Sequence, residues 1–120
     1  MELIWESGRD FIMARYIASH QQLLFRSDKG MGGRTRLEVA FGPVQYLSLH
    51  TLVYENFSIF ELSPEELELC SPRPATVASS CKIYGIGSPK PTGLVIAPGY
   101  ASLEDDGNYW EPSNLLRFDS

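Results

Sequence analysis

RTRLEVAFGPVQYLSLHTL, residues 34–52, contains two runs of alternating side chains separated by a Gly-Pro pair. Strict alternation is typical of a strand with one buried face, so the pattern predicts a β-hairpin. With a three-residue loop at 42–44, Val39 lies opposite Leu47 and the large apolar side chains of both strands share one face. The polar face of this hairpin then carries Arg36, Glu38, Tyr46, Ser48 and His50.

The rest of the chain predicts further strands and one short helix. Apolar and β-branched runs between turn residues predict strands at 20–27, 56–62, 80–86 and 94–98. Ser63, Pro64 and Glu66 form a capping-box pattern, which predicts a helix of about two turns that begins after Ser63. Residues 8–21 are interpreted as a second helix, with a strand as the alternative.

These elements add up to six to eight strands and one or two short helices. They predict an α+β or mostly β fold built on an antiparallel sheet. A chain of 120 residues fits one domain, which we place at 1–120. Aromatic residues make up 12% of the chain, and they favour the half-buried surfaces of sheets, so the composition agrees with a β-rich fold.

Charge and hydropathy argue against nucleic acid and membranes as partners of the chain. A net charge of -5 disfavours nucleic acid as a partner, because phosphate binding needs clustered Lys and Arg. No run approaches the roughly 20 apolar residues that span a bilayer, so no membrane partner is expected. Residues 1–16 do not resemble a secretory signal. We therefore expect a cytoplasmic protein in which Cys70 and Cys81 are reduced.

The glycine-rich segment Asp28–Gly33 lies immediately before the alternating run. It lacks the spacing of a P-loop or of a dinucleotide-binding loop, and a strand follows it in place of a helix. We interpret it as a mobile connection between strands. The alternative is an anion site formed by backbone amides with Lys29, Arg34 and Arg36.

No cofactor, metal or catalytic residue is predicted. His20 and His50 are the only histidines, and no pair of cysteines or histidines has the spacing of a zinc site. The cysteines match no nucleophile motif and are interpreted as structural thiols. We lean towards a protein that is not an enzyme.

The segment LEDDGNYWEP, residues 103–112, contains the predicted partner-binding residues. Asp106-Gly107 predicts a hairpin turn. Trp and Tyr are enriched at the centres of protein interfaces, so we predict contact with a protein partner through Glu104, Asp105, Asp106, Tyr109 and Trp110. For Trp110 itself, the favoured interpretation is that it packs inward and closes the core.

Two functional hypotheses follow from these observations. The first is a small acidic binding module that acts on a protein partner, by analogy with antitoxins and immunity proteins, or that forms a homodimer through exposed sheet edges. The second is a small-molecule or anion site, catalytic or not, on the polar face of the 34–50 hairpin. Its predicted residues are Lys29, Arg34, Arg36, Glu38, Tyr46 and His50.

Overall fold

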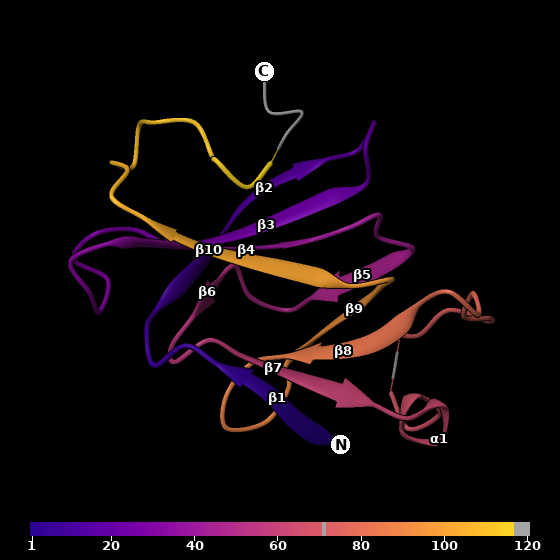
Figure 1. Cartoon of the computed structure of the whole chain (residues 1–120). Helices are drawn as coiled ribbons and strands as arrows, with labels where there is room; N and C mark the ends of the chain where they lie inside the picture. The colour runs from indigo at the N-terminus through magenta and orange to yellow at the C-terminus, as the bar shows by residue number, and fades with distance from the viewer. Residues whose placement is uncertain (71, 117–120) are drawn as a thin grey trace.

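Two antiparallel sheets make up the protein in the computed structural model shown in Figure 1. The structure describes residues 1–70 and 72–116. Within them the chain forms ten strands and one four-residue helix, so the mostly β alternative is the correct fold class. The strand number exceeds the predicted six to eight because two short strands were missed near the N-terminus and at residues 53–54.

Each sheet has five strands, and the chain crosses between the sheets several times. Sheet A has the strand order β1 (Glu2–Glu6), β7 (Ser58–Leu62), β8 (Lys82–Ile86), β9 (Gly93–Ala97), β5 (Tyr46–Leu49). Sheet B has the order β10 (Tyr100–Asp105), β4 (Arg36–Phe41), β3 (Gln22–Ser27), β2 (Phe11–Ile17), β6 (Val53–Tyr54). The helix α1 (Pro64–Leu67) follows β7.

The core between the sheets is built around aromatic side chains. Phe57 is fully buried, and its ring lies 4.6 Å from that of Phe11 and 4.9 Å from that of Phe25. Val39 and Phe41 of β4 point into the same core, as the alternation predicted. Aromatic pairs at these distances add to the stability that comes from their burial.

The predicted hairpin at 34–52 is wrong. β4 pairs with β3 and β10, whereas β5 pairs with β9 in the other sheet. The chain changes sheets at the cis Gly42-Pro43 peptide. Leu47 and Leu49 still pack against the core, but they do so from the sheet opposite β4. Alternation determines which face of a strand is buried, and it does not determine whether its neighbour lies beside it or across the core.

The interpretation of residues 8–21 as a helix is wrong, and the strand alternative is correct. This segment contains β2, whose register against β3 shifts between Met13 and Arg15. Such a bulge moves the following side chains to the opposite face. The alternation is therefore interrupted once, and the apolar spacing resembles that of a helix.

The capping box predicted at Ser63 is confirmed. The Ser63 hydroxyl accepts from the Glu66 amide at 3.2 Å, and the Glu66 carboxylate accepts from the Ser63 amide at 2.9 Å. The helix α1 is shorter than the two turns expected, with four residues. No helix in the described part of the chain has the length and apolar character needed to cross a membrane.

The predicted hairpin at Asp106-Gly107 does not form, because no strand follows β10 among the described residues. We call residues 107–116 the C-terminal strap. Figure 1 shows it in yellow, turning back from the end of β10 toward β2. The strap lies on the outer face of sheet B, where Leu116 is buried.

Candidate functional site

Two surfaces of the molecule could bind a partner or a ligand. One is formed by the C-terminal strap on the outer face of sheet B. The other is a groove on the outer face of sheet A, between α1 and residues 73–79. We describe the strap first because a cluster of buried charges lies beneath it.

Arg36 attaches the strap to sheet B. Its side chain is fully buried, which is rare for arginine unless every donor is paired. Nε and Nη2 donate to the two carboxylate oxygens of Asp105, both at 2.8 Å. Nη1 donates to the backbone carbonyls of Asn108 at 3.3 Å and Glu111 at 3.0 Å, and Nη2 to that of Pro112 at 3.3 Å. One guanidinium therefore joins β4, β10 and the strap.

Glu38, two residues along β4, is the second fully buried charge. Its carboxylate accepts from Arg26 Nε at 2.9 Å and Nη2 at 2.8 Å. It also accepts from the Ser113 hydroxyl at 3.0 Å, and that hydroxyl accepts from the Leu116 amide. Arg36, Glu38, Arg26 and Asp105 form what we call the ionic cluster.

Arg36 and Asp105 each shift the pKa of the other. The hydrogen bonds from Arg36 hold the pKa of the Asp105 carboxyl well below its usual range, and the Gly107 amide contributes. The same hydrogen bonds, opposed by burial, raise the pKa of the Arg36 guanidinium. Gly107 lies so close that a Cβ there would be 2.4 Å from Arg36 Cζ. Its position therefore requires glycine.

The strap presents two aromatic side chains to solvent. Tyr109 is 70% exposed and Trp110 is 68% exposed. Their rings meet edge to face with centroids 5.0 Å apart. We call them the aromatic pair. The favoured interpretation, in which Trp110 packs inward and closes the core, is wrong, because the Trp110 side chain is largely exposed.

The backbone that carries the aromatic pair is held on both sides. Arg26 Nη1 donates to the Tyr109 carbonyl at 3.4 Å, and Arg36 binds the carbonyls of the residues before and after the pair. A shallow hollow of about 330 Å³ lies beside the pair. It is lined by Ala14, Arg15, Leu24, Arg26, Tyr109, Trp110, Glu111 and Pro112.

The three predicted acidic partner residues have different environments. Asp105 is bound to Arg36, so its carboxylate belongs to the ionic cluster. Glu104 accepts a hydrogen bond from the Thr35 hydroxyl. The Asp106 side chain is 92% exposed and pairs with Lys29 at 3.2 Å. Of the three, Asp106 is the most exposed, and it lies three residues before Tyr109.

The predicted ligand set on the 34–50 hairpin is not brought together. Arg36 and Glu38 lie buried beneath the strap, while Tyr46 lies on β5 of sheet A and His50 follows that strand. Lys29 donates to Asn108 at 3.4 Å at the edge of the strap. Arg34 is exposed in the connection before β4. The prediction depended on the hairpin, and the change of sheet at Gly42 separates its two halves.

The glycine-rich segment connects β3 to β4, and two of its glycines, Gly32 and Gly33, pack against Arg9. A Cβ at Gly33 would lie 2.8 Å from Arg9 Cζ. Arg9 donates to the Thr35 hydroxyl at 3.1 Å and to the Ser27 carbonyl at 3.4 Å. The glycines therefore allow close approach of an arginine of the same chain.

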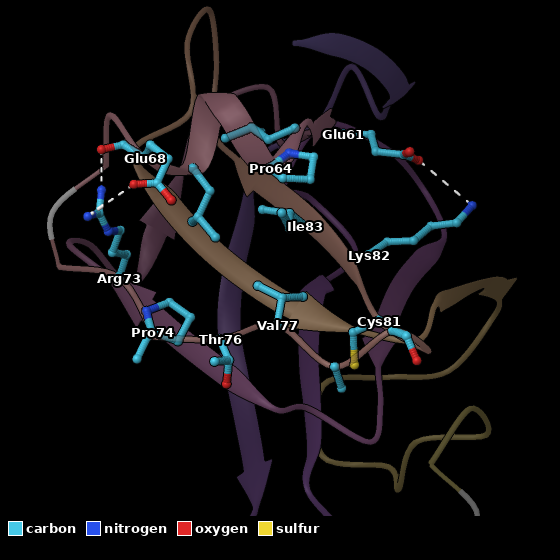
Figure 2. Close-up of a pocket in the computed structure, with 15 residues that line it drawn as sticks. Glu61, Pro64, Glu68, Arg73, Pro74, Thr76, Val77, Cys81, Lys82 and Ile83 are labelled. Carbon is cyan, nitrogen blue, oxygen red and sulfur yellow. Dashed lines mark hydrogen bonds and ion pairs between the residues drawn. The ribbon is translucent and has the colours of Figure 1, made fainter.

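The groove on sheet A is the larger hollow, with a volume of about 570 Å³. Figure 2 shows α1 on one side of it and residues 73–79 on the other. Leu62, Leu67, Val77 and Ile83 give it an apolar lining, and the Cys81 thiol lies at one end. Leu67 and Ile83 belong to a second apolar cluster, outside the main core, with Leu94 and Ile96. We call this hollow the sheet-A groove.

Each end of the sheet-A groove carries an ion pair. Arg73 Nη2 lies 3.2 Å from the Glu68 carboxylate, and Arg73 also donates to the Glu68 carbonyl. At the other end, Lys82 Nζ lies 3.8 Å from Glu61 (Figure 2). All four side chains are more than 40% exposed, so these pairs add little to stability and are free to rearrange.

Gln45 holds the far wall of the sheet-A groove in place. Its side-chain amide donates to the Thr76 carbonyl at 3.0 Å and accepts from the Ala78 amide at 3.0 Å. The sequence analysis did not identify this groove. The signal was present in the prolines at 72 and 74, which keep the chain extended after α1 so that it returns along the sheet.

Within residues 1–70 and 72–116, no group of three or more His, Cys, Asp or Glu side chains could hold a metal ion. Comparisons with protein-family models, with curated proteins and with solved structures found no significant match. The assignment of a function therefore depends on the two surfaces themselves.

Proposed function

We propose that this chain is a cytoplasmic binding module that acts through a protein partner, and that the aromatic pair is the centre of its contact surface. One observation carries the proposal. Tyr109 and Trp110 are each about two-thirds exposed, yet the backbone around them is bound by the buried Arg36 and the half-buried Arg26. Large aromatic side chains that are exposed to solvent on a well-held backbone segment are typical of protein-binding surfaces.

The energetics of binding favour such an arrangement. Ordering a loop on association costs free energy, and a loop that is already fixed avoids this cost. Tyr and Trp bury a large area with few rotatable bonds. The hollow beside the pair offers space for a side chain of the partner.

The charge of the surface indicates a basic partner. The chain carries a net charge of -5, and Asp106 and Glu111 lie next to the aromatic pair. Complementary charge increases the rate of encounter and fixes orientation. An antitoxin- or immunity-type role agrees with this chemistry by analogy.

Native mass spectrometry of the tagged protein from its own host tests the proposal. Three samples are compared: the wild type, the double variant Tyr109→Ala/Trp110→Ala, and the control Leu52→Ala/Val53→Ala, which removes two other exposed apolar side chains. A partner mass that is kept by the wild type and the control, and lost from the aromatic variant, is the expected result. A partner kept by the aromatic variant, or a bare chain in every sample, would contradict the proposal.

A second candidate function is supported by the sheet-A groove. We infer that it takes a small molecule with an apolar body and an acidic group, because the lining is apolar and a cation lies at each end, Arg73 and Lys82. Its volume of about 570 Å³ is within the range of small-molecule sites. This site differs from the one predicted on the 34–50 segment.

The aromatic sulfonate 8-anilinonaphthalene-1-sulfonate is a suitable probe for the sheet-A groove. Val77→Glu places a carboxylate inside the groove, and Ser80→Glu places the same charge on a nearby exposed residue that does not line it. The probe's fluorescence on titration should show weaker binding to Val77→Glu than to Ser80→Glu. Equal binding to the two variants would reject the groove as the site.

A further inference from the structure

Arg73 is held at the end of the sheet-A groove by two contacts of different kinds. One is to the backbone of Glu68, whose carbonyl oxygen accepts from Nη1. The other is to the side chain of the same residue, whose carboxylate lies 3.2 Å from Nη2. The backbone carbonyl moves only with the end of α1, whereas the carboxylate can leave by rotation of its own side chain. The backbone contact therefore holds the guanidinium in place when the carboxylate is exchanged.

The Glu68 carboxylate is weakly held. Its side chain is 71% exposed, so water weakens the pair with Arg73. Among the described residues, Arg73 is its one partner. By contrast, the Asp105 carboxylate accepts from Arg36, from the Gly107 amide and from the Asn114 side chain. Replacing the Glu68 carboxylate on Arg73 by another acid group therefore costs little.

The position of this carboxylate indicates where an acid group would bind. Figure 2 shows it on the side of Arg73 that faces the apolar lining, whereas Lys82 reaches away from the lining toward Glu61. An acid group in its place would lay its apolar body over Leu67 and Ile83. A planar guanidinium can bind an acid group through two parallel N–H donors, which an ammonium group cannot do. Of the two cations, Arg73 is therefore the better acid-binding group.

We propose that the Glu68 carboxylate is an internal competitor at the sheet-A groove, and that the carboxylate or sulfonate of a ligand replaces it on Arg73. This inference rests on the small-molecule function proposed for the groove. The ligand is an anion whose apolar body, buried against the lining, offsets the lost ion pair. A neutral molecule of the same shape leaves the pair of Glu68 and Arg73 intact and gains nothing from Arg73.

Two dyes of nearly the same shape test the exchange. 8-Anilinonaphthalene-1-sulfonate carries an acid group, and N-phenyl-1-naphthylamine is the same body without it. Fluorescence titration of the sulfonate should show about threefold tighter binding to Glu68→Gln than to the wild type. The control Glu65→Gln makes the same change of charge at an exposed residue of α1 that does not line the groove, and it should match the wild type. Neither variant should change the binding of the neutral dye.

A double-mutant cycle separates competition from general repulsion between Glu68 and an anion. Arg73→Gln should weaken binding of the sulfonate about fivefold. Glu68→Gln should then have little effect when Arg73→Gln is already present, because no cation is left to compete for. Repulsion alone would give the same gain from Glu68→Gln in both backgrounds, and that result would overturn the proposal. Circular dichroism checks that each variant is folded.

Failure of the exchange is distinguishable from failure of the site. If Val77→Glu weakens binding of the sulfonate relative to Ser80→Glu, but Glu68→Gln binds it no better than Glu65→Gln, the groove is the site and the exchange is wrong. If Val77→Glu and Ser80→Glu bind it equally, both proposals fail. The comparison of Glu68→Gln with Glu65→Gln remains decisive if Arg73→Gln disturbs residues 73–79, because both of these variants keep Arg73.

Discussion

The outer faces of the two sheets are covered in opposite ways. On sheet A, α1 and the chain after it cover Ile83, Leu94 and Ile96 with apolar side chains. On sheet B, the C-terminal strap covers Arg36 and Glu38 with backbone carbonyls and a serine hydroxyl. The first cover is held by apolar burial, and the second by hydrogen bonds to buried charges.

The way in which each cover is held determines the surface that it presents to solvent. Apolar packing is not directional, and on sheet A it leaves an open groove with mobile charged ends. Hydrogen bonds to a guanidinium have fixed directions, and on sheet B they fix the backbone beside two exposed rings. This contrast underlies the two proposals, a small molecule for the first surface and a protein partner for the second.

The largest effect is expected where the ionic cluster is broken. Asp105→Asn removes the carboxylate that binds Arg36 at 2.8 Å and leaves the buried guanidinium with the Glu38 carboxylate 4.0 Å away. We expect a loss of about 3 kcal/mol in the free energy of unfolding, measured by urea denaturation. The control Asp106→Asn removes an exposed carboxylate and should change stability by less than about 0.5 kcal/mol. Equal effects from the two variants would refute the role of the cluster.

A slightly smaller effect is expected on the other cover. Leu67→Ala removes a buried side chain from the second apolar cluster and should cost about 2 kcal/mol. The control is Leu69→Ala, since Leu69 is 88% exposed. Added salt should leave the Leu67→Ala effect unchanged, because no charge takes part. If the loss of stability in Leu67→Ala depends on salt, charges contribute to the cover on sheet A, and the contrast with sheet B is wrong.

At low pH, the free energies of unfolding of the wild type and of Asp105→Asn should become more similar. The folded-state pKa of Asp105 is depressed by Arg36, so its stabilisation is complete above the unfolded pKa of about 3.9. It is lost as the pH falls from there towards the lower folded-state pKa. Urea unfolding at a series of pH values measures the difference in the free energy of unfolding between the two proteins. This difference should be constant near neutrality and should decrease below about pH 4. A difference that stays constant into acid would contradict the assignment.

The smallest effect concerns the start of α1. Ser63→Ala removes one hydrogen bond of the capping box and should cost about 1 kcal/mol. Ser63→Asp keeps an acceptor at the same position and should cost less. Thermal unfolding of both variants measures the difference. If the two variants unfold at the same temperature, the capping bond contributes nothing to the apolar cover.

Local chemistry in the sequence predicted local structure well. The alternation at β4 identified Val39 and Phe41 as core residues, and the capping box identified the start of α1. Both depend on residues close in sequence. The pairing of β4 with β3 and β10 depends on where the chain crosses between sheets, which alternation does not encode.

The candidate site was predicted only in part. Tyr109 and Asp106 were identified from residue type and lie at the surface, whereas Trp110, which was expected to pack inward, is exposed as well. The role of Arg36 and Glu38 was missed, because polar side chains alternating with apolar ones normally indicate a solvated face. Their burial is caused by the strap, which lies about seventy residues away in sequence. No local pattern reports such a contact.

The most direct test of the central claim is the backbone order of Tyr109 and Trp110 in solution. NMR relaxation of their amides reports this order, and a solvent-borne paramagnetic agent reports the exposure of the Trp110 indole. In the wild type we predict order parameters of about 0.85, as in a rigid backbone, together with an exposed indole, and a clear fall in order in Asp105→Asn. Mobile amides in the wild type, or the same order in both proteins, would contradict the claim that the ionic cluster fixes the aromatic pair.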